Sequence, residues 1–477
     1  MKTLLTKMKS YKVLIPLILL LIVGGTIVYH TTKSLPEGLS YEGGVYQTDH
    51  VRFLYDLTYK DSDGNVRKEQ QIFQRVLEAV EEAEEFIVLD MFLFNNYVNE
   101  DKNYPKITET LTETLIDMKE EKDVQIHVIT DPVNLTYGSH ATGHLQEMRD
   151  HGIEVIFTNL EPLRDSNPLY SGVWRVFLQW FGQAGEGWLP NPMASTAPDV
   201  TLRSYLELLN VKANHRKVLV TDQTAIVASA NPHDESGFHS NIALETDGNV
   251  IADLLETEQA VADFSGGSKF PEMEKKADRG SMNVQALTEG KIHQHVVGEL
   301  NDSQPGDKVW IGMFYLADRK VIDAIGKAAE RGAEVRIILD PNKNAFGNKK
   351  SGLPNVPVAA ELVRMGNDNI EVKWYNTGEE QYHSKIIYFD RGEERMVIGG
   401  SANFTRRNLD DLNLETNLKV WGPSDAESMQ EVDFYFKRIW TNEDGEFTLS
   451  YNENEDKLTA AKYIVYWIQK LLRLTTF

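Results

Sequence analysis

Two copies of one short pattern contain most of the residues in this sequence whose types and spacing could do chemistry. Each copy has a histidine and a lysine two residues apart, an aspartate five residues after the lysine, then a Ser-Ala-Asn stretch and a glutamate. The first copy comprises His215, Lys217, Asp222, Ser229, Asn231 and Glu245, and the second comprises His383, Lys385, Asp390, Ser401, Asn403 and Glu415. A lone His-x-Lys is expected roughly once by chance in a chain with 12 histidines. The whole set occurring twice is not, so we expect both copies to be functional.

A histidine beside a lysine suits a phosphate better than a metal ion. Residues two apart on a strand share a face, so the histidine and the lysine of each copy point the same way. The lysine would repel a cation, whereas it can neutralise a phosphate oxygen while a neutral imidazole attacks phosphorus. A second, protonated imidazole must then supply a proton to the leaving oxygen. His215 and His383 together would provide both groups, without a metal or a cofactor.

The remaining members of each copy are expected to support this reaction. A carboxylate that accepts the other ring N–H fixes the tautomer of a histidine and raises its basicity, a role that fits Glu245 and Glu415. Serine hydroxyls and asparagine amides can complete a cradle for the phosphoryl oxygens. The candidates for this cradle are Ser229, Asn231, Ser401 and Asn403.

The elements that must position these residues also repeat. Patterns typical of buried strands cover 86–93, 128–132 and 153–159 in one part of the chain and 309–316, 338–341 and 370–376 in another, with helical patterns between them. This order predicts a duplicated α/β unit with a mostly parallel sheet in each half. We expect a first half over 45–264, a polar linker over 265–280 and a second half over 281–445.

The repeated pattern resembles the signature of the phospholipase D superfamily, His-x-Lys-x4-Asp followed by Gly-Ser-x-Asn. The resemblance covers about residues 45–440, and the first copy departs from the signature at Ala228, where glycine is usual. It implies two α/β sandwich halves related by a pseudo-two-fold axis, with one site at the seam. It also implies a metal-independent ping-pong reaction through a phosphohistidine. His215 would be the nucleophile and His383 the general acid, although the symmetry would allow the reverse. Asp222 and Asp390, which belong to the catalytic motif, would hold it together.

A membrane anchor is predicted at the N-terminus. Residues 1–12 carry four lysines and no acid, and residues 13–29 carry no charge, which is the length of a short transmembrane helix. No small-x-small cleavage site follows, so a retained anchor is favoured over a cleaved signal peptide. The lysines would stay in the cytoplasm, which places the catalytic region on the extracytoplasmic side of the cell membrane in a single-pass arrangement.

Two further segments are rich in apolar side chains. The first half carries an insertion over 160–212 whose aromatic residues include Trp174, Phe177, Trp180, Phe181 and Trp188. This insertion could line an apolar substrate groove, enter a lipid interface, or form a subdomain with its own small core. Residues 457–474 predict an amphipathic helix, which could dock on the core or lie on the membrane.

Several polar residues outside the two copies have ambiguous patterns. Asp131 and Asp340 each precede a proline at the end of an expected strand, where an aspartate can contribute to a site or cap a turn. Four histidines occur in two closely spaced pairs, His140 with His144 and His293 with His295. We expect the pair His293 and His295 to share a strand face. We interpret all four as structural or surface residues, and no metal site is expected.

Composition narrows the function. Lys+Arg 49 against Asp+Glu 72 gives a formal net charge of −23, which opposes nucleic-acid binding over most of the surface. The absence of cysteine excludes disulfides, thiolate nucleophiles and zinc–cysteine sites. Taken with the resemblance and the predicted anchor, these observations favour a membrane-anchored, metal-independent phosphodiesterase that hydrolyses phospholipids. The alternatives are a phosphatidyltransferase like cardiolipin synthase, a nuclease, and a catalytically silent lipid-binding scaffold. Cardiolipin synthases typically begin with two membrane helices, whereas one is predicted here.

Overall fold

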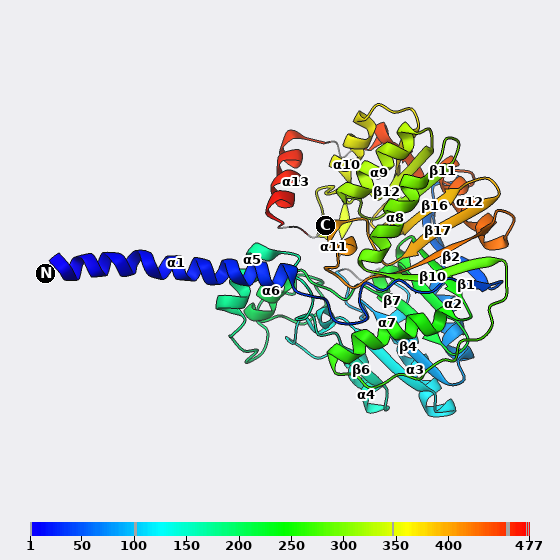
Figure 1. The fold of residues 1–477 in the computed structure, drawn as a ribbon. Helices are drawn as coiled ribbons and strands as arrows, with labels where there is room; N and C mark the ends of the chain where they lie inside the picture. The colour runs from blue at the N-terminus through cyan, green and yellow to red at the C-terminus, as the bar shows by residue number, and fades with distance from the viewer. Residues whose placement is uncertain (1, 100–102, 346–347, 455–457, 474, 476) are drawn as a thin grey trace.

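Figure 1 shows the computed structural model, which describes residues 2–99, 103–345, 348–454, 458–473, 475 and 477. The N-terminal helix α1 (Lys2–Thr32) projects to one side of a body built from two sheets and their flanking helices. The first half of the chain forms the lower part of the body in this view, and the second half forms the upper part.

Two large sheets carry the strands of the body. The first sheet has the order β3-β2-β9-β8-β7-β4-β5-β6. Its strands are β2 (Val51–Lys60), β3 (Val66–Glu69), β4 (Phe86–Met91), β5 (Gln125–Thr130), β6 (Glu154–Phe157), β7 (Lys217–Thr221), β8 (Ala225–Ala228) and β9 (Asn241–Thr246). The second sheet has the order β1-β10-β18-β17-β16-β11-β12-β15-β19. Its strands are β1 (Tyr46–Thr48), β10 (Met282–Thr288), β11 (Lys308–Met313), β12 (Glu334–Leu339), β15 (Ile370–Tyr375), β16 (Lys385–Asp390), β17 (Glu394–Gly400), β18 (Thr416–Pro423) and β19 (Thr448–Ser450). A small ribbon pairs β13 (Asn344–Ala345) with β14 (Asn348–Lys349).

The two sheets share one topology over seven strands. The order β2-β9-β8-β7-β4-β5-β6 in the first sheet corresponds to β10-β18-β17-β16-β11-β12-β15 in the second, which confirms the duplicated α/β fold. The expectation of mostly parallel sheets is wrong. In each half only the last three strands of this order pair in parallel, and the other pairs are antiparallel. The turns 222–224 and 391–393 are too short for a parallel crossover, so they force hairpins.

Helices cover both sheets and fill the seam between them. In the first half these are α2 (Ile72–Glu82), α3 (Ile107–Lys122), α4 (Gly143–Asp150) and α7 (Val250–Ser265), and in the second α8 (Gly290–Asp302), α9 (Arg319–Glu330), α10 (Asn355–Arg364), α11 (Arg406–Leu409) and α12 (Glu427–Thr441). Short helical turns are η1 (Pro132–Leu135), η3 (Asp234–Phe238) and η4 (Tyr451–Glu453). α2–α4 pack on the outer face of the first sheet and α8–α10 on the outer face of the second. α7 and α12 belong to a hydrophobic cluster that joins the inner faces of both sheets, so the core is continuous across the seam.

Helix α9 shows how the sequence determines such an element. The side chain of Asp318 caps its first turn by accepting a hydrogen bond of 3.0 Å from the N–H of Val321. The apolar residues of α9 recur at helical spacing and are buried on one face. The Nε2 of His293 lies 3.1 Å from Asp318. Both His293 and His295 lie within helix α8, so the expectation that they share a strand face is wrong.

The chain crosses between the halves near its beginning. β1 lies at residues that the sequence assigns to the first half, yet it pairs with β10 at the edge of the second sheet. The expected start of the first half at residue 45 is therefore corrected, because residues 46–48 make their strand hydrogen bonds in the second sheet. Residues 266–280, within the expected linker, form no helix or strand.

Three apolar segments lie on the side from which α1 projects. The span of α1 that is long and apolar enough to cross a membrane is Tyr11–Thr32, with a mean hydropathy of 2.3, slightly longer than the expected 13–29. Its last turns pack on the insertion, where Gly172 closely approaches Val23 and Ile27. The insertion itself forms α5 (Pro168–Val173), the π-helical turn η2 (Trp174–Leu178) and α6 (Leu202–Leu208). Helix α13 (Ala460–Leu472), within the expected 457–474, lies on the same side (Figure 1).

Candidate active site

A cavity of about 500 Å³ lies at the seam between the two halves. His215 and His383 are both on its wall, as are Asn231 and Asn403. Each histidine lies two residues before the first strand of the central hairpin in its own sheet, His215 before β7 and His383 before β16. The duplicated topology therefore delivers both copies of the pattern to one place.

The backbone of each histidine is held by the opposite half. The N–H of His215 donates to the carbonyl oxygen of Leu414 at 2.9 Å, and the N–H of His383 donates to that of Ser240 at 2.8 Å. This exchange fixes the two histidine segments relative to one another.

Asp131 and Asp340 anchor the residues that precede the histidines. The Oδ2 of Asp131 accepts the N–H of Asn214 at 2.8 Å, and the Oδ2 of Asp340 accepts the N–H of Tyr382 at 2.7 Å. Each aspartate also caps its own turn, since Oδ1 accepts the N–H two residues later. Burial raises the pKa of both carboxyl groups to about 7. They are positioning residues behind the wall.

The two histidine rings have different partners. The Nδ1 of His215 lies 2.9 and 3.0 Å from the carboxylate oxygens of Glu415, which comes from the second half. The Nδ1 of His383 lies 3.1 Å from the Oδ1 of Asn241, which comes from the first half. The Nδ2 of Asn241 faces the carbonyl of His239 at 3.4 Å, which fixes the orientation of this amide. A carboxylate therefore supports one ring and a neutral amide supports the other.

Glu245 does not have the supporting role expected from the sequence. The N–H of Ser229 donates to Ile242 and the N–H of Ser401 donates to Thr416, so the counterpart of Glu415 is Asn241. Glu245 lies four residues farther along β9, where it forms an ion pair of 2.8 Å with Arg75. Spacing in the sequence predicts Glu245 as the acceptor for a histidine ring, whereas the strand register places Asn241 in that role.

The serines also have a different role from the one expected. The hydroxyl of Ser229 donates to Asn241 at 3.1 Å, and the hydroxyl of Ser401 donates to Glu415. Both serines are fully buried and are absent from the described cavity wall. They hold the partners of the histidine rings, and only Asn231 and Asn403 of the expected phosphate cradle face the cavity.

The motif lysines are completely buried beside the histidines. The Nζ of Lys217 donates to the carbonyl of His215 at 2.7 Å, and Lys385 donates likewise to His383. Burial lowers the pKa of Lys217 to about 7 and lowers that of Lys385 well below its usual value. Burial, and next the charge of the nearest lysine, lower the pKa of both motif histidines. A bound anion would offset the repulsion among these cationic groups, so the electrostatics favour a phosphate.

Replacing Lys385 with methionine is expected to raise thermal stability while abolishing turnover. The pKa of this buried lysine is lowered from 10.5, so at neutral pH the unfolded state binds more protons than the folded state. Stability therefore increases as the pH rises towards 10.5, and removal of the charge eliminates the cost at lower pH. We expect calorimetry to show an unfolding midpoint about 2–4 °C higher than wild type at pH 7, and a smaller difference at pH 10.

Lys437→Met is the matched control, because Lys437 is largely exposed and pairs with Asp433 on a helix surface. A midpoint for Lys385→Met that falls below those of both wild type and the control would contradict the electrostatic account.

Asp222 and Asp390 lie away from the cavity. Asp222 follows β7 and Asp390 is the last residue of β16, so both lie at the opposite ends of these strands from the histidines. Asp222 accepts the N–H groups of Glu84 and Glu85 at 3.0 Å each, and Asp390 accepts the N–H of Gly392 at 3.1 Å. Their grouping with the catalytic residues is therefore corrected, because they stabilise turns and contact none of the reacting groups.

Sequence reasoning missed several polar residues of the wall. The ring of His239 lies 6.0 Å from that of His383, and its Nδ1 accepts the N–H of Gln381 at 3.2 Å. The neutral ring therefore carries its proton on Nε2. Burial lowers the pKa of His239 to about 3. Arg407, Tyr137 and Tyr315 also line the cavity. Aligning the halves on Asn241 and Glu415 would have pointed to His239, which stands two residues before Asn241.

The insertion contributes apolar residues to the cavity, but not the aromatic residues expected from the sequence. Pro192, Met193 and Leu209 are on the wall. Trp174 is buried inside the insertion, whereas the other four aromatic residues of the set are exposed. Two of the alternatives for this segment therefore coexist, since it both has a small core and lines the groove.

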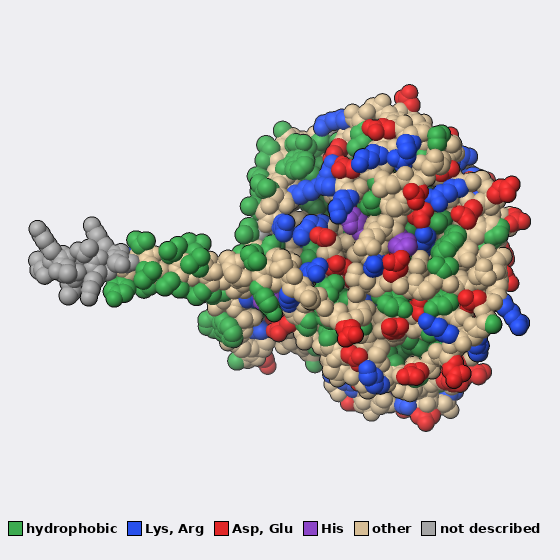
Figure 2. Space-filling view, in the orientation of Figure 1, with side chains coloured by type: hydrophobic (Ala, Val, Ile, Leu, Met, Phe, Trp, Pro, Cys, Tyr) green, Lys and Arg blue, Asp and Glu red, His purple; other side chains and the backbone are tan. Residues whose placement is uncertain are grey.

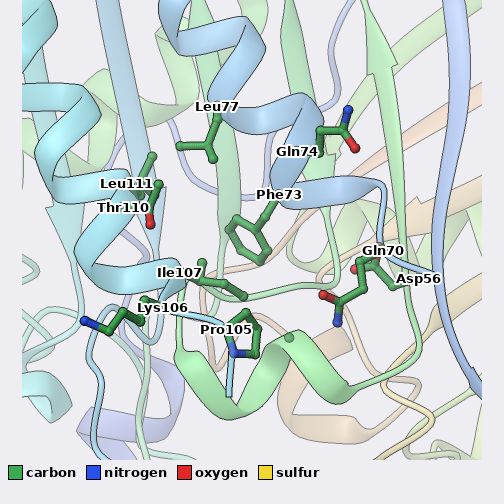
Figure 3. A pocket seen from close by; sticks show the side chains of 11 residues that line it. Asp56, Gln70, Phe73, Gln74, Leu77, Pro105, Lys106, Ile107, Thr110 and Leu111 are labelled. Carbon is green, nitrogen blue, oxygen red and sulfur yellow. The ribbon is translucent and has the colours of Figure 1, made fainter. Parts of the chain in front are cut away.

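A second cavity, of about 240 Å³, lies in the first half between α2 and α3 (Figure 3). Its wall combines Phe73, Leu77 and Ile107 with one carboxylate, Asp56. The Oδ1 of Asp56 accepts the N–H groups of Gln71 and Ile72, so this carboxylate caps a helix. The described wall residues include no histidine, whereas His215 and His383 both lie on the wall of the cavity at the seam.

Comparisons with known proteins bear on the family and on the fold of the chain. Residues 296–440 match the family described as "Cardiolipin synthase, PLD-like domain". The fold is similar to that of phosphatidylserine synthase from Haemophilus influenzae Rd KW20, with 12% identity, coverage of 91% of this chain and 96% of that chain, and a TM-score of 0.58. The phospholipase D family member Nuc from Salmonella typhimurium matches 35% of this chain and 97% of its own, with 16% identity and a TM-score of 0.27. The family match bears out the resemblance to the phospholipase D superfamily over residues 296–440, and the phosphatidylserine synthase shows that the fold of the whole chain is similar to a known one.

Proposed function

We propose that this phospholipase D-like chain is a membrane-anchored phosphodiesterase that cleaves phospholipids through a phosphohistidine. The observation that carries the proposal is that His215 and His383 share one cavity wall, each with Nδ1 held by an acceptor. A neutral ring that donates from Nδ1 has its lone pair on Nε2. One imidazole can then attack phosphorus while the other, protonated, serves the leaving oxygen.

The difference between Glu415 and Asn241 favours His215 as the nucleophile. A phosphohistidine ring is cationic at the moment of its formation, and a carboxylate stabilises that charge better than an amide does. Burial raises the pKa of Glu415 to about 8, while Lys217 and the hydrogen bonds from Ser401 and Asn408 oppose this rise. The amide beside His383 leaves that ring a stronger acid, which suits proton donation.

The reaction then proceeds in two balanced steps. The Nε2 of His215 forms a bond to phosphorus, the bond from phosphorus to the leaving alcohol breaks, and His383 gives its proton to the departing oxygen. His383 next takes a proton from water, the new oxygen bonds to phosphorus, and the P–N bond breaks. Lys217 and Lys385 supply positive charge close to the phosphoryl group, because a bound phosphate favours the protonated form of both lysines. Because these charges would repel a divalent cation, we propose that the reaction needs no metal ion.

An apolar face supports the membrane location. We define this face as the exposed side chains of the insertion and of α13, namely Phe177, Trp180, Phe181, Trp188, Ile464, Trp467, Ile468 and Leu471. In Figure 2 apolar side chains gather on the edge of the body from which α1 projects. The cavity takes Leu209 and Gln469 from the same two segments. We propose that this face lies on the leaflet and that the lysines of 1–12 hold the N-terminus in the cytoplasm.

Transfer to an alcohol is the second candidate. The matching family is described by the name of cardiolipin synthase, and the protein of similar fold is a phosphatidylserine synthase. Either reaction shares the first step, and only the second nucleophile differs. The products therefore decide between water and a lipid alcohol as the acceptor.

The proposed function predicts phosphatidic acid as the product from labelled phosphatidylglycerol and phosphatidylethanolamine vesicles. The full chain would be reconstituted in the vesicles with EDTA present, with single-stranded DNA in a parallel reaction and products identified by mass spectrometry. Cardiolipin as the product would identify the transferase.

We expect Glu415→Gln to slow the reaction by about 10- to 100-fold, because it removes one charge-assisted hydrogen bond.

Glu245→Gln is the matched control, since Glu245 lies outside the cavity and should leave the rate unchanged. Cleaved DNA with intact lipid, or turnover that EDTA abolishes and added metal restores, would refute the proposed function.

A further inference from the structure

Arg407 is a buried cation on the cavity wall without an acidic partner. It belongs to α11, which follows the Ser-Ala-Asn stretch of the second copy, and only 6% of its surface is exposed. Among the described residues no carboxylate lies within ion-pair distance of its guanidinium. Its Nη2 donates to the carbonyl of Thr475, and its Nε has no partner. A buried guanidinium without a neutralising partner destabilises the folded protein unless a bound anion pairs with it.

The surroundings of Arg407 show the same incompleteness. Asn403, Asn413 and Gln469 each have a buried side-chain oxygen without a hydrogen-bond partner, and all three line the cavity. Burial, and next the nearby charge of Arg406, lower the pKa of Arg407 to about 9. Buried polar atoms are normally satisfied, so several unsatisfied atoms on one wall indicate a place for a polar ligand.

This polar wall is close to the reacting groups. Asn408, the neighbour of Arg407, donates to the carboxylate of Glu415, which in turn contacts the ring of His215. Asn403 belongs to the motif itself. The motif lysines and histidines already account for the scissile phosphate, so the charge of Arg407 is available to another group of the same substrate.

We infer that Arg407, with Asn413 and Gln469, forms a subsite for a second anionic group, a phosphate or carboxylate in the head group or the acceptor. The guanidinium would bind the anion, and the amide oxygens would accept hydrogen bonds from neighbouring hydroxyl or ammonium groups. This inference rests on the proposed function and adds the substrate class. The chain would then prefer phospholipids whose polar part carries a charge beyond the phosphodiester.

The test compares four substrates with the full chain in mixed micelles containing EDTA. Phosphatidylglycerol has no second anion, phosphatidylserine has a carboxylate, and phosphatidylglycerol phosphate has a phosphomonoester. Bis(p-nitrophenyl) phosphate reports the chemistry alone. We expect wild type to show a higher kcat/KM for one or both of the doubly anionic lipids, by about 10- to 100-fold, and the preferred one identifies phosphate or carboxylate.

Arg407→Gln should remove this preference and leave the rate on bis(p-nitrophenyl) phosphate within about threefold of wild type. Arg407→Lys should restore part of the preference. Arg406→Gln is the matched control, because Arg406 pairs with Asp410 and is not among the described wall residues. Equal loss on all four substrates in Arg407→Gln, or no preference in wild type, would overturn the inference. Failure of wild type on bis(p-nitrophenyl) phosphate and on every lipid would instead refute the proposed function.

Discussion

Replacing His215 with asparagine is expected to abolish phosphodiester cleavage, with a fall in kcat of at least about 10⁴-fold. The loss should be equally severe on a phospholipid and on bis(p-nitrophenyl) phosphate. An activated leaving group lowers the demand for an acid, but it cannot replace the atom that forms the P–N bond. Initial rates of both reactions, measured with EDTA present, give the comparison.

His151→Asn is the control for this variant. His151 lies at the surface of the first half, where its Nδ1 pairs with Glu120 at 2.6 Å, and the variant should keep wild-type rates. Rapid turnover of the activated substrate by His215→Asn would show that another group is the nucleophile. The assignment would then pass to His383, which the pseudo-symmetry permits.

Replacing His383 with asparagine should give a different pattern, because this residue is proposed to move protons. Lipid cleavage should fall by about 10²- to 10⁴-fold, since the alcohol leaves poorly without an acid. With bis(p-nitrophenyl) phosphate the first step needs no acid, so one equivalent of p-nitrophenolate should appear in a burst. The reaction should then stop, because no base activates water for the second step.

Stopped-flow absorbance at enzyme concentrations comparable to those of the substrate would resolve the burst. Its amplitude should equal the concentration of folded protein. The absence of a burst, together with a burst in His215→Asn, would reverse the two roles. Equal steady rates on both substrates would show that His383 transfers no proton.

Much of the site could be predicted because its signal is local. A histidine and a lysine two residues apart repeat with their downstream residues, and this repetition alone identifies His215 and His383. The duplicated halves followed from the same strand and helix order. Chain order does not specify strand orientation, however, so the antiparallel central hairpins were not foreseen.

The partners of the histidine rings could not be predicted, because they depend on register across the seam. Asn241 and Glu415 occupy equivalent positions at the starts of β9 and β18, yet each supports the histidine of the other half. Sequence spacing instead favoured Glu245, which is directed to Arg75. The serines were misassigned for a similar reason, since a hydroxyl that holds a ring partner looks the same in sequence as one that binds phosphate.

The peripheral segments illustrate a different limit. The apolar spacing of α13 is compatible with either a core or a lipid surface, and only the fold shows that Tyr466 is buried while Trp467 and Leu471 are exposed. The wall position of Arg407 has no sequence signature either. It depends on how the fold places α11, which follows the second Ser-Ala-Asn stretch, against the cavity.

The most direct test of the account is to locate the covalent intermediate. The full-length His383→Asn variant would be mixed with bis(p-nitrophenyl) phosphate in EDTA, quenched in alkali to preserve the P–N bond, digested, and sequenced by mass spectrometry. The account predicts one phosphoryl adduct, carried by His215. An adduct on any other residue, or no adduct while p-nitrophenolate is released, would contradict it.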